Sequence, residues 1–332
     1  MALKGTNQES GRPYNRRLVL ETIRLHAPVA RGAIAKRVGL TVQTVSTIIR
    51  ELERQGFVLG ARETPKGRGL PPTSLTINPE GGFALGVHVT PIGLKAALIN
   101  LAGEVIGARE RRLPQLRPNP AFREIGRLVA DLRKLRPNGR MLGIGLAMPG
   151  PFDVDAMSFV GPTTLEGWKG IAVRERLANL TGLPAFIEVD LAAAALGERL
   201  YGAGRSLREF YYLYFGFGLG GCQVHDGAPL RGAFGNAGEI GHLPLVIGGE
   251  PCACGNRGCL ERYLSLEAMR RRSAAIGFEG WVAEAAPFLR AAIAAIENLY
   301  DPETSRPRPP SDGAAAPQPR RSRPGAMSLP SS

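Results

Sequence analysis

The sequence lacks the long apolar run that a membrane-spanning protein needs. Its 332 residues contain no uninterrupted stretch of about 18 apolar side chains, the minimum for a spanning helix. The first 15 residues also lack the apolar core of a secretory signal peptide. We therefore predict no membrane partner and a cytoplasmic location, where cysteine side chains stay reduced.

The central part of the chain also lacks net charge, although the whole sequence carries +13. Residues 79–303 contain 24 lysines and arginines against 23 acidic residues. Residues 1–78 contain 13 against 5, and residues 304–332 contain 5 against 1. A basic N-terminal module on a neutral body predicts a polyanionic partner for that module alone. The length exceeds what one core supports, so we expect two or three domains.

The N-terminal part has the pattern of a winged helix-turn-helix domain over residues 14–80, after a polar arm at 1–13 that we expect to be flexible. Apolar spacing predicts helices at 14–26, 31–38 and 41–55, and strands at 57–59 and 75–77 for a wing. Gly39 ends the second helix and Thr41 caps the third, which is the layout of a helix-turn-helix. The predicted buried stripe of the third helix is Val42, Val45, Ile49 and Leu52.

The third helix is the expected recognition helix, whose exposed side chains enter the major groove of DNA. Gln43 has the chemistry to read adenine edges, whereas arginines suit phosphates. A small protein-interaction module with a basic surface is the alternative interpretation. The predicted DNA-contacting residues on this helix and at the wing tip are Gln43, Thr44, Ser46, Thr47, Arg50, Arg54, Lys66 and Arg68.

The body alternates strands with helices, which predicts an α/β domain over residues 81–303. The expected strands are at 83–89, 94–99, 105–108, 141–148, 185–189 and 210–215. The expected helices are at 121–135, 173–181, 191–201 and 289–300. Residues 216–221 are glycine-rich and predict a loop.

Three of the four cysteines lie within eight positions, at Cys252, Cys254 and Cys259, and His242 precedes them by ten residues. Three thiolates and one imidazole form the closed tetrahedral set that structural zinc prefers. Gly255 and Gly258 allow the tight turns that this requires. A disulfide would leave one of the three cysteines over, and a set of free thiols is the remaining alternative.

Two motifs in the body resemble the ROK family, which joins sugar kinases and sugar-responsive repressors. They are Glu239-x-x-His242 and Cys252-x-Cys254-x-x-x-x-Cys259-x-Glu261. The resemblance implies a two-lobed sugar-kinase fold related to actin and ribonuclease H. With an N-terminal winged helix, the chain looks like the bacterial repressor branch, such as the xylose or N-acetylglucosamine repressors. That branch implies operator DNA, a sugar effector, and a homodimer or a dimer of dimers.

The resemblance also implies roles for particular side chains. Asp190 matches the general base of the kinases and would be vestigial here. Glu239, His242 and Glu261, together with Asp190, match residues that bind sugar hydroxyls. His242 would bind zinc through one ring nitrogen and sugar through the other.

The sequence departs from the family at both phosphate loops, which predicts a protein that binds no ATP and is not an enzyme. The first loop, usually Asp-x-Gly-Gly-Thr, is residues 88–92 here, with His88 in place of the aspartate and Pro91 lacking an amide donor. The second loop has Phe217 between its glycines. Two alternatives stay open: a sugar kinase with an accessory DNA-binding module, and a remnant regulator that no longer senses a ligand.

The last 29 residues, 304–332, contain seven prolines and no apolar periodicity. This composition predicts a disordered tail. The family continues here with a strand and helices that complete the second lobe. We therefore expect the body to be incomplete at its C-terminal end, through truncation or a shifted reading frame. A native basic tail that adds nonspecific DNA affinity is the alternative.

Overall fold

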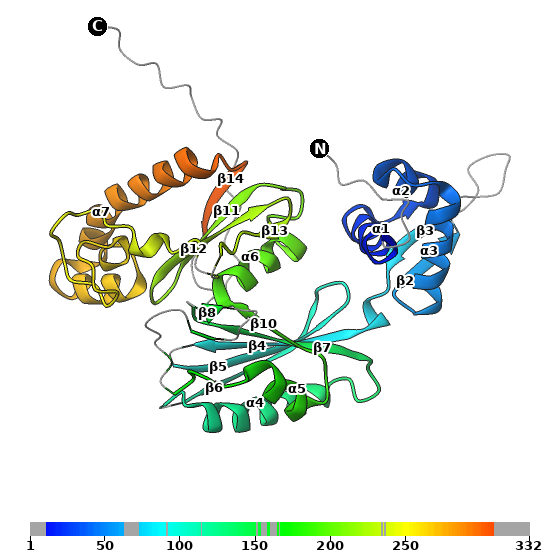
Figure 1. The fold of residues 1–332 in the computed structure, drawn as a ribbon, viewed down its shortest axis with the longest axis horizontal. Coiled ribbons are helices and arrows are strands. Elements are labelled where there is room, and N and C mark those ends of the chain that lie inside the picture. Colours follow the sequence, from blue (N-terminus) through cyan, green and yellow to red (C-terminus); the bar gives the residue numbers. More distant parts are fainter. Residues whose placement is uncertain are drawn as a thin grey trace, which may run out of the picture.

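The computed structural model describes residues 11–62, 73–90, 92–113, 115–150, 152–153, 158–159, 165, 167–233, 235 and 237–308. Three parts follow one another along the chain: a winged helix domain, a first lobe built on a five-stranded sheet, and a second lobe built on a four-stranded sheet (Figure 1). No helix in these described ranges is long and apolar enough to cross a membrane.

The winged helix domain contains three helices and a small sheet of order β1-β3-β2. Its helices are α1 (Arg12–His26), α2 (Arg31–Val38) and α3 (Val42–Arg54), and its strands are β1 (Val29–Ala30), β2 (Val58–Arg62) and β3 (Thr73–Ile77). Gly39 ends α2 in the left-handed conformation, at φ 68°. Thr41 caps α3, because its hydroxyl accepts a 3.1 Å hydrogen bond from the Thr44 amide. The predicted helix-turn-helix and the paired wing strands are confirmed.

The predicted buried stripe of α3 was wrong at one position. The Val42 side chain is 54% exposed, and Ile48 is buried in its place at 6%. Val45, Ile48, Ile49 and Leu52 follow the spacing of one helix face, whereas Val42 lies in the first turn, beyond the reach of the core. The predicted wing-tip residues Lys66 and Arg68 lie outside the described residues.

The first lobe is a sheet of order β10-β7-β4-β5-β6. Its strands are β4 (Phe83–Thr90), β5 (Gly93–Asn100), β6 (Val105–Arg112), β7 (Met141–Met148) and β10 (Ala185–Val189). β4, β5 and β6 form an antiparallel meander, while β7 and β10 run parallel to β4. Helices α4 (Pro118–Arg133) and α5 (Val173–Thr181) cover one face (Figure 1). A short hairpin of β8 (Phe152–Asp153) and β9 (Ser158–Phe159) lies apart from this sheet.

The second lobe is a sheet of order β13-β12-β11-β14 with one long helix. Its elements are β11 (Phe210–Phe215), β12 (Leu219–His225), β13 (Ala228–Pro229), α7 (Leu266–Tyr300) and β14 (Thr304–Arg308), with 3-10 turns η3 (Ile240–His242) and η4 (Leu260–Arg262). A further 3-10 turn, η2 (Pro79–Gly81), joins the winged helix domain to the first lobe. Helix α6 (Asp190–Tyr201) links the two lobes and packs against strands of both.

The structure corrects three predictions in the second lobe. Residues 304–308 form β14, parallel to β11, so this part of the predicted tail is wrong; residues 309–332 lie outside the described residues. Main-chain pairing with β11 holds residues 304–308 in a strand. Amino-acid composition alone does not predict such pairing. Residues 219–221 belong to β12 rather than to a loop, because they pair with β11. The last helix begins at Leu266, with a break at Gly277, rather than at residue 289.

Candidate metal centre and ligand cleft

The three clustered cysteines and His242 come together as one group. Their ligand atoms all lie within 4.8 Å of one another. The Sγ atoms of Cys254 and Cys259 are 3.6 Å apart, and Cys252 Sγ is 3.6 Å from His242 Nδ1. Thiolates that each lie about 2.3 Å from a tetrahedral zinc ion are separated by about 3.8 Å, so the donor set fits zinc. All four cysteines are free, which excludes the disulfide alternative.

Glycines shape the loop that carries the cysteines, as the sequence predicted. Gly255 and Gly258 both have positive φ, at 92° and 73°. A Cβ atom at Gly258 would lie 1.6 Å from the carbonyl oxygen of Val246, so only glycine fits there. The Cys252 amide donates to the Asn256 carbonyl at 2.9 Å and closes the turn. The positions of the thiols are therefore set by the backbone.

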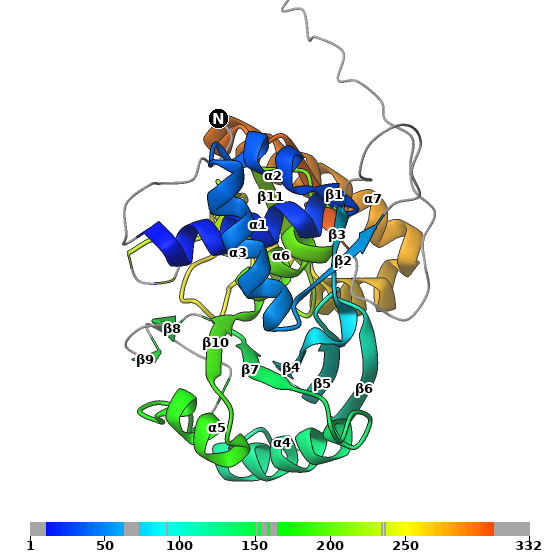
Figure 2. The same cartoon turned by 90° about the vertical axis from the view of Figure 1, so that its right-hand side faces the viewer.

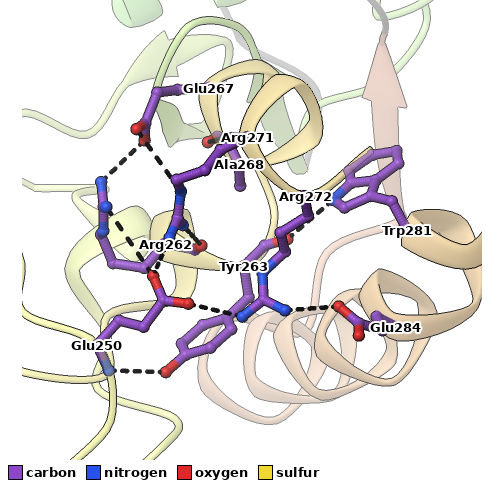
Figure 3. Close-up of polar contacts among 10 residues, drawn as sticks. Glu250, Arg262, Tyr263, Glu267, Ala268, Arg271, Arg272, Trp281 and Glu284 are labelled. Carbon is purple, nitrogen blue, oxygen red and sulfur yellow. Dashed lines mark hydrogen bonds and ion pairs between the residues drawn. The ribbon is translucent and has the colours of Figure 1, made fainter. Parts of the chain in front are cut away.

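An arginine network holds this loop against α7 (Figure 3). The carboxylate of Glu250, two residues before Cys252, accepts hydrogen bonds from Arg271 at 2.5 Å and from Arg272 at 2.6 Å. Arg272 also bonds Glu284 at 2.6 Å, further along α7. Sequence reasoning missed this network, because these residues come from separate segments and have no motif spacing.

The two ring nitrogens of His242 face different groups. Nδ1 lies on the metal side, near Cys252, and is also 3.6 Å from Glu261 Oε1. Nε2 is 4.0 Å from Glu239 Oε2. Burial raises the pKa of the Glu239 carboxyl above its ordinary value, His242 opposes this rise, and the charges of Asp190 and Glu261 add to it. The four residues predicted to bind sugar therefore lie in one electrostatic cluster, and their binding role stays a prediction.

Asp190 stands where three structural elements meet. It follows β10 directly and is the first residue of α6, whose Leu191 amide donates to Asp190 Oδ1 at 2.8 Å. Its Oδ2 is 3.8 Å from His88 Nε2 on β4. A cleft of about 660 Å³ opens beside it, and its lining includes His88, Lys95, Tyr212 and Tyr214. A cleft of this size suits a sugar-sized ligand.

Two segments lie where we predict that the family's phosphate loops are altered. Thr90 and Gly93 are partners at the end of the β4–β5 ladder, and the Thr90 hydroxyl donates to the Gly93 carbonyl at 3.1 Å. In the second segment the Gly216 amide donates to the Gly218 carbonyl at 3.0 Å, and the Phe217 side chain is half exposed. A Cβ atom at Gly218 would lie 3.2 Å from Glu261 Oε2, so this turn borders one of the residues predicted to bind sugar.

The face of α3 predicted to contact DNA presents basic and polar side chains. Gln43, Thr47, Arg50 and Arg54 are exposed, whereas Thr44 and Ser46 are half-buried. Arg50 lies along the helix, with Nε 3.3 Å from the Ser46 carbonyl oxygen and Nη2 3.3 Å from the Thr47 hydroxyl.

The acidic residues of α3 point away from that face. Glu51 pairs with Arg12 at 3.2 Å and with Arg16 at 3.5 Å, and Glu53 pairs with Arg31 at 3.3 Å. These pairs neutralise the carboxylates at the contacts with α1 and α2. The exposed face of α3 is left with the sign of charge that DNA requires.

The C-terminal end of α6 contacts α1 of the winged helix domain (Figure 2). Glu21 pairs with Arg199 at 3.1 Å, and Arg24 donates to the Leu200 carbonyl while its guanidinium lies 5.8 Å from the centre of the Tyr201 ring. Although burial raises the pKa of Glu21, hydrogen bonds and charge from Arg24 and Arg199 hold it below its ordinary value. We call these five residues the α1–α6 contact. Sequence reasoning did not find it.

Comparison with known proteins supplies the family. The sequence profile of the ROK family matches residues 84–303, which is more than half of the chain. The chain belongs to the ROK family. A profile described as winged helix-turn-helix DNA-binding matches residues 12–58. The resemblance seen in the motifs is thereby confirmed.

Several characterised ROK proteins are similar over most of this chain. The xylose repressor of Bacillus subtilis is 27% identical over 259 residues, covering 77% of this chain and 66% of the relative. The xylose repressor of Caldicellulosiruptor bescii is 30% identical over 262 residues, covering 77% and 64%. The Escherichia coli regulator NagC is 25% identical over 273 residues, covering 80% and 66%. The chain thus spans about two thirds of the length of these relatives.

Solved structures show the same fold. A ROK family transcriptional regulator, a homologue of the E. coli MLC protein, superposes with a TM-score of 0.74 and 23% identity, covering 89% of this chain and 83% of that one. The ROK hexokinase of Thermus thermophilus superposes with a TM-score of 0.59 and 26% identity, covering 68% and 80%. The superposition with the regulator covers more of this chain than the superposition with the hexokinase does.

Proposed function

We propose that this protein is a sugar-responsive transcriptional regulator, acting as a repressor, that binds operator DNA through its winged helix domain and does not transfer phosphate. The observation that carries the proposal is the path of α6. Asp190 begins this helix in the ligand cleft, and Tyr201 ends it against α1 of the winged helix domain. The names of the xylose repressors and NagC support the proposal.

In this proposal zinc occupies the site formed by His242, Cys252, Cys254 and Cys259 and has a structural role. The ion would hold the loop that carries Glu261 beside η3, which carries Glu239 and His242. With Nδ1 directed at the metal side, the Nε2 atom of His242 is left for a sugar hydroxyl. The sugar would bind among Asp190, Glu239, His242 and Glu261.

The same helix offers a route from the cleft to the DNA. A sugar that binds Asp190 changes the position of α6 only if it binds one arrangement of the lobes more tightly than the other. A shift of α6 reaches the winged helix domain through the α1–α6 contact. In a homodimer, this would change the separation of two recognition helices on a pseudo-palindromic operator.

Phosphoryl transfer needs positioned charge around the phosphate being moved. His88 replaces the aspartate of the first phosphate loop, and Phe217 replaces a hydroxyl residue in the second. No ATP is required for the proposed role. These features favour ligand sensing over kinase activity.

The proposal is tested by thermal-shift measurements over a sugar panel together with a coupled assay of ATP turnover. At least one sugar should raise the Tm of the protein, and Asp190→Asn should lose most of that rise because it alters a ligand contact. Asp131→Asn is the matched control, since Asp131 is on α4 and pairs with Lys134. Sugar-dependent ATP turnover that disappears in Asp190→Asn would instead show a kinase. DNA binding without any sugar-induced shift would show a ligand-blind regulator.

A further inference from the structure

A row of side chains crosses the face of the first-lobe sheet that lies opposite α4 and α5. By strand register, Glu188, Ala147, His88, Lys95 and Glu110 are neighbours across β10, β7, β4, β5 and β6. Two cavities, of about 690 and 660 Å³, are both lined by His88, Lys95 and Ala147. The row therefore forms the floor of one continuous groove that begins at Asp190.

Two cationic or protonatable side chains lie side by side on this floor. His88 and Lys95 are directly opposite in the antiparallel register, which places their Cβ atoms about 4.5–5.5 Å apart. Lys95 is exposed, and its ammonium forms no ion pair or hydrogen bond with any described residue. The neighbouring floor is open, because a Cβ atom added at Gly86 or Gly145 would meet nothing within 4 Å.

Four acidic residues lie near this pair, and one of them, Glu110 on β6, is directly opposite Lys95 on its other side and lines the larger cavity. Glu188 is paired with Arg231. The Glu198 carboxylate accepts a 2.9 Å hydrogen bond from the Ala203 amide, at the far end of α6. Asp190 Oδ2 is 3.8 Å from His88 Nε2. His88 therefore lies between Lys95 and Asp190, one of the residues predicted to bind sugar.

We propose that His88 and Lys95 form an anion subsite, and that the effector is therefore an anionic sugar, carrying a phosphate ester or a carboxylate. This inference rests on the proposed sugar-responsive function and specifies its ligand. A sugar whose hydroxyls contact Asp190 and Glu239 directs a substituent on the Asp190 side toward His88 and Lys95. An ammonium and an imidazole N–H donate charge-assisted hydrogen bonds, which suit phosphate and carboxylate oxygens.

Isothermal titration of the full-length, zinc-loaded protein tests the subsite with matched pairs of ligands. The pairs are glucose and glucose 6-phosphate, and N-acetylglucosamine and its 6-phosphate; glucuronate tests the carboxylate, and inorganic phosphate tests the anion alone. In at least one pair the anionic member should bind roughly tenfold to a hundredfold more tightly, and added salt should reduce this advantage. Binding of phosphate esters but not glucuronate would identify phosphate as the group recognised, and the reverse would identify carboxylate.

Substitutions at Lys95 separate the charge from the shape of the groove. Lys95→Gln should reduce the preference for the anionic member to near unity, whereas Lys95→Arg should retain most of it. Lys134→Gln is the matched control and should leave the preference unchanged, because Lys134 is the C-cap residue of α4, which covers the other face of the sheet. Loss of the preference in the glutamine variant alone would support a role in ligand binding over a role in folding.

Two outcomes would overturn the inference. If a neutral sugar binds as tightly as its anionic partner, the subsite is wrong while the proposed sensing function stands. If neither member of any pair binds, the sensing function itself fails and the subsite fails with it. A preference that survives Lys95→Gln would also contradict the assignment of this residue.

Discussion

The imidazole of His242 belongs to two groups of side chains at once. Its Nδ1 atom is 3.6 Å from Cys252 Sγ, and its Nε2 atom is 4.0 Å from the Glu239 carboxylate. A metal bound on the Nδ1 side fixes the orientation of the ring, and so fixes where Nε2 points. The proposed zinc site would therefore order the side chains predicted to bind sugar as well as the loop.

Removal of one thiol tests this link. Cys254→Ser should lower bound zinc from one ion per chain to near zero, as measured by elemental analysis. The Tm should fall by at least about 5 °C, since each lost kcal/mol lowers the Tm of a domain of this size by about 2–4 °C. Sugar-induced thermal shifts should weaken in parallel.

Cys222→Ala provides the control for that experiment. Cys222 is buried in β12, outside the metal cluster, and burial raises the pKa of its thiol to about 12. Its replacement should leave one zinc ion per chain. A metal-free Cys254→Ser protein with an unchanged Tm and unchanged sugar response would contradict the structural role of zinc.

Among single residues, the sequence predicted the site residues that belong to motifs and missed the site residues that do not. The spacing of three cysteines and His242 was enough to predict the cluster, because the loop is short and its glycines allow the turns. Lys95 had no such spacing. Its place beside His88 depends on strand register, which the sequence pattern leaves undetermined.

Helix α6 connects the regions that the proposed function must couple. Its first residue is in the ligand cleft, and its last turn carries the Arg199 and Leu200 groups that contact α1. A second contact lies nearby, where Arg140 donates to the Gln55 carbonyl at 3.2 Å. The winged helix domain is thereby held against the two-lobed body at two places.

Breaking the α1–α6 contact should uncouple the two activities. Arg199→Ala removes the pair with Glu21 and should reduce the effect of sugar on operator affinity by roughly threefold to tenfold, within the usual range of allosteric coupling. Sugar affinity measured by titration calorimetry without DNA should change less than the coupling. Arg127→Ala on α4, whose side chain pairs with Glu124, is the control. An Arg199→Ala protein with full sugar response would exclude this route.

Elements with strong periodicity were predicted well, and elements held by pairing were not. The predicted bounds of α2, α5, β7, β10 and β11 match the structure, because apolar residues run through them and a glycine or proline adjoins at least one end of each. β14 has no apolar spacing and contains Pro307, so it is defined only by its pairing with β11. β12 begins Leu219-Gly220-Gly221, and this pair of glycines predicts a turn when it is considered alone.

The whole molecule places a basic module on an almost neutral body. The acidic residues of α3 pair inward with arginines of α1 and α2, so the exposed surface of the module keeps its positive charge. The two-lobed body carries the cleft and the metal centre, and it contacts the module through α6. The fold class could be predicted from the order of elements and from the resemblance, whereas the relative placement of the three parts required the structure.

Operator affinity measured with and without sugar tests the central claim most directly. A labelled duplex is first selected from a random pool by the full-length protein, and its Kd is then measured by fluorescence anisotropy at fixed salt. A saturating sugar, identified by thermal shift, should change this Kd by at least about fivefold. An operator affinity that stays the same when the cleft is saturated would contradict the account, because binding in the cleft would then not reach the winged helix domain.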